Sequence, residues 1–411
     1  MVRQPPPPGL PKAASNEEGS AQVAPFKFLV PRDDQNMQII GGKISRTFYP
    51  RRCRRKRPYS DIDSLSDELL MEVLAHISGP DIYGARLVCR KWYHIIHTCG
   101  FMRFYLQHAT YGLLFKCSIL GSYLMLPQGR VRVEITKLRY KRRRIVTSTC
   151  NGLWSENQLG NWDNLYVMNP TTGQVVLLPP LVNRVQTGFH AIGYVPASME
   201  YKAVIFWPAS VIEKRMYFYI LNVGVDKSWR KVEYESTTPF RKHHFMISEG
   251  FMHWTHPPTN QVLTVNLETE TFTETPGPIP VAGTGSVNNI YLSTGRYLSL
   301  LRRSGDYSWE IWEMSRPERG EWRKKADLSL EAHKGRFKQL GLRHYEFLIP
   351  VGWVKYSELL ALKSDDKKHR TGVFLYNLIT QEFDKIELPF YISMSKPMVY
   401  KSSLEWLDAA V

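Results

Sequence analysis

The sequence has no run of about 18 consecutive apolar residues, the length that an α-helix needs to cross a bilayer. Its opening residues, MVRQPPPPGLPK, lack the apolar core of a secretory signal. It has only five cysteines, at positions 53, 89, 99, 117 and 150, and none forms a C-x-x-C pair. These absences argue against a membrane span, a disulfide framework and a structural zinc site. We therefore expect a soluble protein of a reducing compartment inside the cell.

Recognisable catalytic and phosphate-binding motifs are also missing. Neither G-x-S-x-G nor H-E-x-x-H occurs. The glycine-rich residues 283–286 (GTGS) follow a proline-rich stretch and open no predicted helix, so they predict a turn rather than a phosphate-binding loop. Four histidines lie close in sequence, at positions 243, 244, 253 and 256, but no acidic ligand accompanies them. On a strand, His253 and His256 would point to opposite faces. We expect no catalytic residue, no metal and no cofactor.

The net charge of +16 comes almost entirely from two short segments. Residues 1–60 carry a net charge of +8 and residues 129–144 a net charge of +7, so the rest of the chain is almost neutral. A protein that follows a phosphate backbone carries Lys and Arg across a whole face. The pattern therefore disfavours a broad nucleic-acid-binding surface. A regulatory protein that contacts nucleic acid through the two basic segments is the alternative from another functional class.

Residues 1–60 are rich in proline, glycine, serine and charge and show neither helical nor strand periodicity, which predicts a disordered leader. This leader ends in a basic run. Its cations are Arg51, Arg52, Arg54, Arg55, Lys56 and Arg57. The run is typical of a nuclear import signal and equally of a solvated tail. A second run, residues 141–144, is interpreted first as an exposed loop, with nuclear import or binding of an acidic substrate as alternatives. We expect the protein in the nucleus, the cytoplasm or both.

Residues 61–108 are predicted to form a small helical domain. Apolar residues recur at helical spacing in a first amphipathic helix: Leu65, Leu69, Leu70, Val73, Leu74 and Ile77. Ser64 with Asp67 resembles a capping box at its start, and Gly79-Pro80 is expected to stop it. A single second helix is expected to carry Ala85, Val88, Trp92, Ile95 and Ile96. A unit of this size cannot bury so much apolar surface alone, so we expect a protein partner to cover it.

Residues 109–411 show the pattern of a mainly β protein. Short apolar and aromatic runs alternate with turn residues, and helical periodicity is almost absent. The motif Asn-x-x-Thr recurs at Asn169, Asn266 and Asn377, with a looser copy at Asn222 that is closed by Trp229. We expect the Asn and Thr side chains to bond the local backbone at the tips of hairpins. The tips are roughly 45 to 65 residues apart, which predicts a β-propeller of about six four-stranded blades rather than a β-sandwich.

Two parts of the chain resemble known families. Residues 64–74 (SLSDELLMEVL) and residues 86–92 (RLVCRKW) resemble the F-box, although Ser66 stands where a proline is usual after the first leucine. The β region resembles the F-box-associated, kelch-like domain found mainly in plant F-box proteins. The pieces that carry this second resemblance are Cys150-Asn151-Gly152-Leu153, Asn169-Pro170-Thr171-Thr172-Gly173, Gly193-Tyr194, Tyr201-Lys202 and Trp309-Glu310-Ile311-Trp312. The paired glycines of a true kelch repeat do not occur in this region.

The resemblance implies a substrate-recognition subunit of a Skp–cullin–F-box ubiquitin ligase, and not an enzyme. In such a ligase the F-box binds a Skp-type adaptor, which joins it to the cullin and RING subunits, while the repeat domain holds a protein target for ubiquitination. The adaptor-binding residues that we assign are Leu65, Leu69, Leu70, Val73, Leu74, Ile77, Leu87, Val88 and Trp92. We expect direct contacts from four of them: Leu65, Leu69, Leu87 and Val88. A β-propeller with its own enzymatic activity is a third alternative.

Overall fold

The computed structural model describes residues 65–117, 121–128, 132–138, 144–158, 161–181, 189–208, 215–237, 245–256, 259–278, 289–339, 348–364, 372–386, 397–405 and 407. All of them belong to the larger of the two units into which the chain divides, Ser60–Val411. Several predictions fall outside the described residues: the leader with its basic run, residues 141–143 of the second run, residues 283–286, and His243 and His244.

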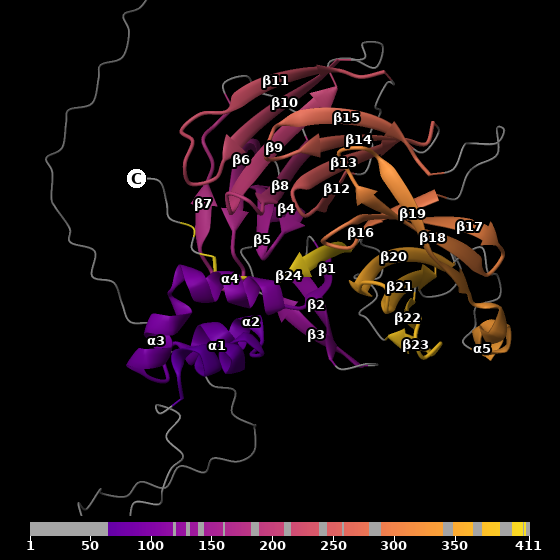
Figure 1. The fold of residues 1–411 in the computed structure, drawn as a ribbon, viewed down its shortest axis with the longest axis horizontal. Coiled ribbons are helices and arrows are strands. Elements are labelled where there is room, and N and C mark those ends of the chain that lie inside the picture. The colour runs from indigo at the N-terminus through magenta and orange to yellow at the C-terminus, as the bar shows by residue number, and fades with distance from the viewer. Residues whose placement is uncertain are drawn as a thin grey trace, which may run out of the picture. The chain divides into compact units, whose positions relative to one another are not determined.

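The described chain begins with four helices, α1 (Asp67–Ala75), α2 (Gly79–Ala85), α3 (Arg90–Ile96) and α4 (Cys99–His108), drawn in indigo and violet in Figure 1. The N-cap of α1 is Ser66, two residues after the predicted Ser64, and its hydroxyl accepts a hydrogen bond from the backbone N–H of Leu69 at 3.4 Å. Gly79-Pro80 opens α2, because proline is tolerated in the first turn of a helix. No helix in the described part of the chain is long and apolar enough to cross a membrane.

The prediction of a single second helix is wrong, because the structure has two helices, α2 and α3, in its place. Cys89 is extended (φ −156°, ψ 170°) and forms the N-cap of α3. Leu87 and Val88 form a turn in which each backbone N–H bonds the carbonyl three residues back, at 3.0 Å, instead of four residues back. The apolar spacing continues across this break, so periodicity alone could not reveal it.

The helices share a small apolar core with one residue from the other end of the chain. The buried members of this core are Leu70, Leu74, Ile82, Ala85, Ile95, Ile96, Phe101, Tyr105 and Leu404. Phe101 and Tyr105 come from α4, which the sequence analysis did not predict as a helix. Leu404 follows the last strand of the chain, so the C-terminal part of the protein completes the core of the helical domain.

Six four-stranded sheets follow, and they are the blades of a β-propeller (Figure 1). The first blade contains β24 (Met398–Lys401), β1 (Tyr111–Cys117), β2 (Gly121–Gln128) and β3 (Arg132–Leu138). The second contains β4 (Arg144–Cys150), β5 (Leu153–Gln158), β6 (Asn161–Met168) and β7 (Val175–Leu177). The third contains β8 (Phe189–Val195), β9 (Glu200–Pro208), β10 (Arg215–Asn222) and β11 (Arg230–Glu235).

The remaining three blades follow in chain order. The fourth contains β12 (Phe245–Ser248), β13 (Phe251–His256), β14 (Gln261–Asn266) and β15 (Thr271–Pro276). The fifth contains β16 (Asn289–Ser293), β17 (Leu298–Gly305), β18 (Ser308–Arg316) and β19 (Glu321–Ser329). A short 3-10 helix (Glu331–His333) and α5 (Lys334–Gln339) precede the sixth, which contains β20 (Leu348–Lys355), β21 (Leu359–Ser364), β22 (Val373–Asn377) and β23 (Phe383–Ile386). The predicted propeller with about six blades is therefore confirmed.

The first blade is built from both ends of the β region. β24 pairs antiparallel with β1, so that Tyr111 lies opposite Lys401 and Leu114 lies opposite Met398. β24 thereby takes the innermost position in this blade, which β4, β8, β12, β16 and β20 take in the other five. The pairing closes the ring, because the last strand of the chain completes a sheet begun by the first.

Asparagine turns close several blades between the third and fourth strands, as predicted. The side-chain Oδ1 of Asn169 accepts hydrogen bonds from the backbone N–H groups two and three residues later, at 2.9 and 3.4 Å. Asn266 and Asn377 make the same pair of hydrogen bonds. The looser copy at Asn222 uses a different turn, in which the backbone N–H of Asn222 donates to the carboxylate of Asp226 at 2.8 Å.

Candidate functional site

The helical domain carries a concentration of exposed apolar side chains. Ten large hydrophobic residues are exposed in the described part of the chain, and five of them lie between residues 69 and 93. They are Leu69, Val73, Leu87, Val88 and Tyr93, with exposed fractions of 58, 53, 69, 64 and 45%. We call these five residues the apolar patch. Exposed apolar surface gathered on one small domain marks a site of protein contact.

The apolar patch is assembled from two places in the chain. Its two members on α1 are one helical turn apart, so they lie on the same face of that helix. Its other members come from the turn between α2 and α3 and from α3 itself. Lys91 of α3 links this helix to the start of α1. Its Nζ donates a hydrogen bond to the backbone carbonyl of Leu65 at 2.6 Å and forms an ion pair with Asp67 at 3.1 Å.

The nine predicted adaptor-binding residues differ in exposure. The exposed ones are Leu69, Val73, Leu87 and Val88. The half-buried ones are Leu65, Ile77 and Trp92. Leu70 and Leu74 are fully buried in the core of the helices, so they hold the helices together and do not reach a partner directly. The prediction that Leu70 and Leu74 contact the adaptor is therefore wrong, and the adaptor role of the other seven residues stays a prediction. Tyr93, which the sequence analysis did not single out, adds an aromatic ring to the patch.

Residues 402–405 and 407, which we call the C-terminal segment, join the helices to the propeller. The side-chain amide of Asn169, in the second blade, donates to the backbone carbonyl of Ser403 at 3.2 Å. The segment also packs closely against the helices. A Cβ atom on Gly79 of α2 would lie 2.7 Å from the Cβ of Ser402, so the close contact between α2 and Ser402 requires glycine. The C-terminal segment therefore contacts both domains.

The described histidines are not arranged as metal ligands. His253 is fully buried, and its two ring nitrogens bond the hydroxyls of Ser248 and Thr264 at 2.8 and 3.0 Å. Burial lowers the pKa of His253 to about 3, which keeps the ring neutral. His256 bonds the hydroxyl of Thr259 instead. Among the described residues, no group of three or more His, Cys, Asp or Glu side chains could hold a metal ion.

Sequence comparisons match both parts of this architecture. A family model described as the F-box associated beta propeller domain matches residues 128–402, and one described as the F-box domain matches residues 62–104. The F-box protein At5g49610 of Arabidopsis thaliana is 23% identical over 297 residues, which cover 66% of this chain and 80% of that protein. A second F-box protein of the same plant, At1g53370, is 26% identical over 187 residues, which cover 42% of this chain and 49% of that protein.

The solved structures that match this chain are distant from it in sequence. A chain of a nidogen/laminin complex is 13% identical, with a TM-score of 0.41, over 71% of this chain and 98% of that one. The kelch-like character of the propeller stays a prediction. The propeller family matches more than half of the chain, and the F-box match precedes it, on the helices. The chain belongs to the F-box-associated β-propeller family of F-box proteins, and its relatives include F-box proteins of Arabidopsis thaliana.

Proposed function

We propose that the chain is the substrate-recognition subunit of a Skp–cullin–F-box ubiquitin ligase. In this role the helical domain binds a Skp-type adaptor, and through it the cullin and RING subunits, while the propeller holds a protein target. Ubiquitin transfer takes place on the other subunits. This chain contributes no catalytic group and acts through proximity, because it raises the local concentration of the target near the transferring enzyme.

The observation that carries the proposal is the apolar patch. Its members are among the most exposed large hydrophobic side chains of the described residues, while Leu70 and Leu74 beneath them are fully buried. The patch is thus presented by packed helices and does not need to refold on binding. Fully burying an exposed Leu or Val side chain is worth about 1.5–3 kcal/mol. The Leu and Val side chains of the patch are 53–69% exposed, so covering each one gains roughly half to two-thirds of that value. An adaptor with an apolar groove therefore gains substantial affinity by covering the patch.

The geometry of the blades supports a separate binding surface for the target. The turn that contains Gly152, between β4 and β5, lies against Ser403, and the turn after Asn169, between β6 and β7, is tied to the same residue. Both turns lie at one end of the blade, since neighbouring strands run antiparallel. The helices adjoin that end. We propose that the target binds at the other end, where the innermost strands of the blades begin.

Substitution of the patch tests adaptor binding. Leu69→Asp together with Val88→Asp removes two apolar contacts and places charge in the interface, so we expect adaptor affinity to fall at least about 30-fold. Calorimetry of the purified full chain with a Skp-type adaptor measures this change. Both side chains are exposed, so thermal melting should match that of the wild type.

The matched control for this experiment is Val225→Asp. Val225 is 61% exposed and lies in the turn between β10 and β11 of the propeller, far in sequence from the patch. This variant gains the same kind of charge and should bind the adaptor as the wild type does. Undiminished adaptor binding by a folded Leu69→Asp, Val88→Asp variant would remove the patch from the interface and the ligase role with it.

A further inference from the structure

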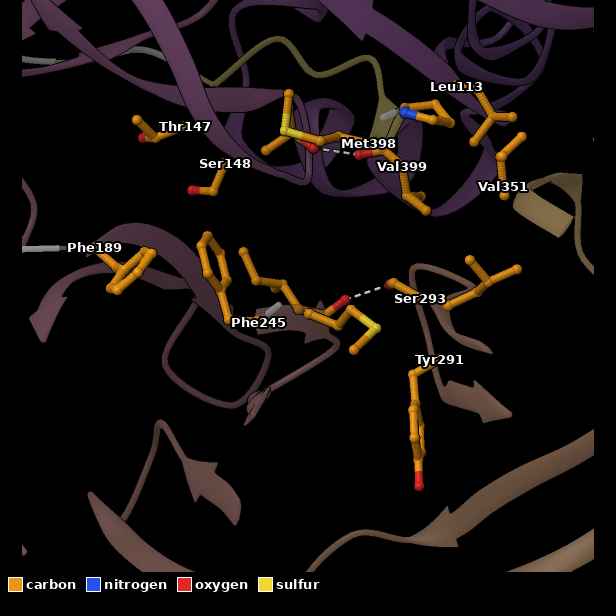
Figure 2. Close-up of a pocket in the computed structure, with 16 residues that line it drawn as sticks. Leu113, Thr147, Ser148, Phe189, Phe245, Tyr291, Ser293, Val351, Met398 and Val399 are labelled. Carbon is orange, nitrogen blue, oxygen red and sulfur yellow. Dashed lines mark hydrogen bonds between the residues drawn. The ribbon is translucent and has the colours of Figure 1, made fainter. Parts of the chain in front are cut away.

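A cavity of about 350 Å³ lies where the six blades meet (Figure 2). Every innermost strand contributes to its wall. One contact from each is Thr147 (β4), Phe189 (β8), Phe245 (β12), Tyr291 (β16), Val351 (β20) and Met398 (β24). Because all six blades supply a wall, the cavity lies on the axis of the propeller.

The hydroxyl groups in the wall are already bonded within the protein. The hydroxyl of Ser148 bonds that of Ser155 at 2.9 Å and accepts a hydrogen bond from the backbone N–H of Ile192 at 2.8 Å. Ser293 donates to the backbone carbonyl of Ile247, as a dashed line in Figure 2 shows. These groups fix neighbouring blades to one another. They therefore add little polarity that a ligand could use.

The rest of the described wall is apolar and uncharged. Phe189 and Phe245 lie close together on one side of the cavity, and Met398 lies across from them (Figure 2). No charged side chain occurs among the described lining residues. An ion in this cavity would lose its hydration without gaining a charged partner, which is strongly unfavourable. The lining thus selects a neutral occupant over a charged one.

The volume of the cavity sets the size of that occupant. An apolar cavity on the order of 150 Å³ stays dry and holds one benzene molecule. The axial cavity, at about 350 Å³, has more than twice that space. It also falls within the range of about 300–1,000 Å³ that small-molecule sites occupy. Its capacity therefore corresponds to two or three aromatic or alicyclic rings.

We propose that the axial cavity is a binding site for a neutral, mainly apolar small molecule of two to three rings. The innermost strands begin at the end of the propeller that lies away from the helices. Phe189 and Phe245 are the first residues of two of these strands, β8 and β12, so the cavity reaches that end. A ligand that enters there would lie beside the proposed target-binding end. The proposal rests on the cavity alone and does not depend on the ligase role.

A pair of fluorescent dyes tests the site on the full chain without any substitution. N-Phenyl-1-naphthylamine is neutral and has three rings, and 8-anilinonaphthalene-1-sulfonate is the same skeleton with one negative charge. We expect the neutral dye to bind saturably at one site per chain, and the sulfonate to bind at least about ten-fold more weakly, because its charge cannot be desolvated there. No saturable binding, or equal affinity for the two dyes, would overturn the proposal.

Filling the cavity locates the bound dye. Val351 is half-buried and faces the cavity in Figure 2, so Val351→Trp should occupy the space and weaken the neutral dye at least about ten-fold. Val225→Trp, the same change on the exposed turn of the third blade, should leave binding unchanged. Unchanged binding by a Val351→Trp variant that melts like the wild type would place the dye elsewhere and contradict the proposal. If the Val351→Trp variant does not fold, the comparison of the two dyes on the wild-type chain still tests the proposal.

Discussion

At the scale of single residues, the same asparagine turn has acquired a second role at one position. Asn266 uses its side-chain Oδ1 to close a turn and is half-buried. Asn169 closes the equivalent turn but is fully buried, and its amide also donates to the carbonyls of Ser403 and Glu405 at 3.2 and 2.9 Å. The spacing Asn-x-x-Thr predicted the turn, which is local. It could not predict the second role, because the partners lie more than 230 residues away.

This difference predicts unequal costs for the same substitution. Asn266→Ala removes the turn bonds only and should lower the free energy of unfolding by about 1 kcal/mol. Asn169→Ala removes the turn bonds and leaves the buried carbonyl of Ser403 and the half-buried carbonyl of Glu405 without this donor, so it should cost about 3 kcal/mol. Urea denaturation of both variants and the wild type measures the two values. Equal losses would show that the bonds to the C-terminal segment contribute nothing to stability.

At the scale of elements, the sequence was most informative where a unit repeats. The turn signals recur blade after blade, so six blades followed from their period even though single strands had weak patterns. The helical domain was harder, because the extended Cys89 interrupts a helical spacing that the side chains themselves continue. The exposed patch residues Leu87 and Val88 lie in the turn directly before this interruption.

The C-terminal segment is the element that sequence analysis could not assign. Leu404 is 2% exposed and lies in the core of the helices, whereas Leu407 is 9% exposed and lies in a propeller cluster. No local pattern in so short a stretch indicates which of the two clusters each leucine joins. Two leucines three residues apart therefore join two different clusters, the second of which also contacts α4 through Leu106.

This arrangement predicts that two Leu→Ala changes destabilise different parts of the chain. Leu404→Ala leaves a cavity among the helices and should cost about 2–5 kcal/mol, with faster hydrogen exchange in α1 and α4. Leu407→Ala should instead speed exchange in β6 and β9, whose side chains share its cluster, and leave α1 protected. Some effect on α4 is expected in both variants, because Leu106 of α4 packs against the cluster of Leu407. Hydrogen exchange read by mass spectrometry separates the two patterns. Faster exchange of the same peptides outside α4 in both variants would contradict the assignment.

At the scale of the whole propeller, the ends of the β region depend on each other. The innermost position of the first blade is filled by β24, which pairs with β1 along four residues. Without it, the edge of β1 would present unpaired backbone groups to its surroundings, and such edges pair with other chains. Ring closure and attachment of the helices also share the same stretch of chain, because the C-terminal segment follows β24 directly.

Removal of residues 397–411 should therefore affect oligomeric state as well as stability. We expect the shortened chain to elute as a larger species in size-exclusion chromatography, since the edge of β1 is open and Leu404 no longer fills the core of the helices. A synthetic peptide of residues 397–411 should restore the size of the wild type, because it can pair with β1 as β24 does. Deletion of residues 408–411 alone is the control, since β24 and the C-terminal segment stay in place. A shortened chain that elutes and melts like the wild type would mean that the ring is held together by contacts between blades and not by the closing strand.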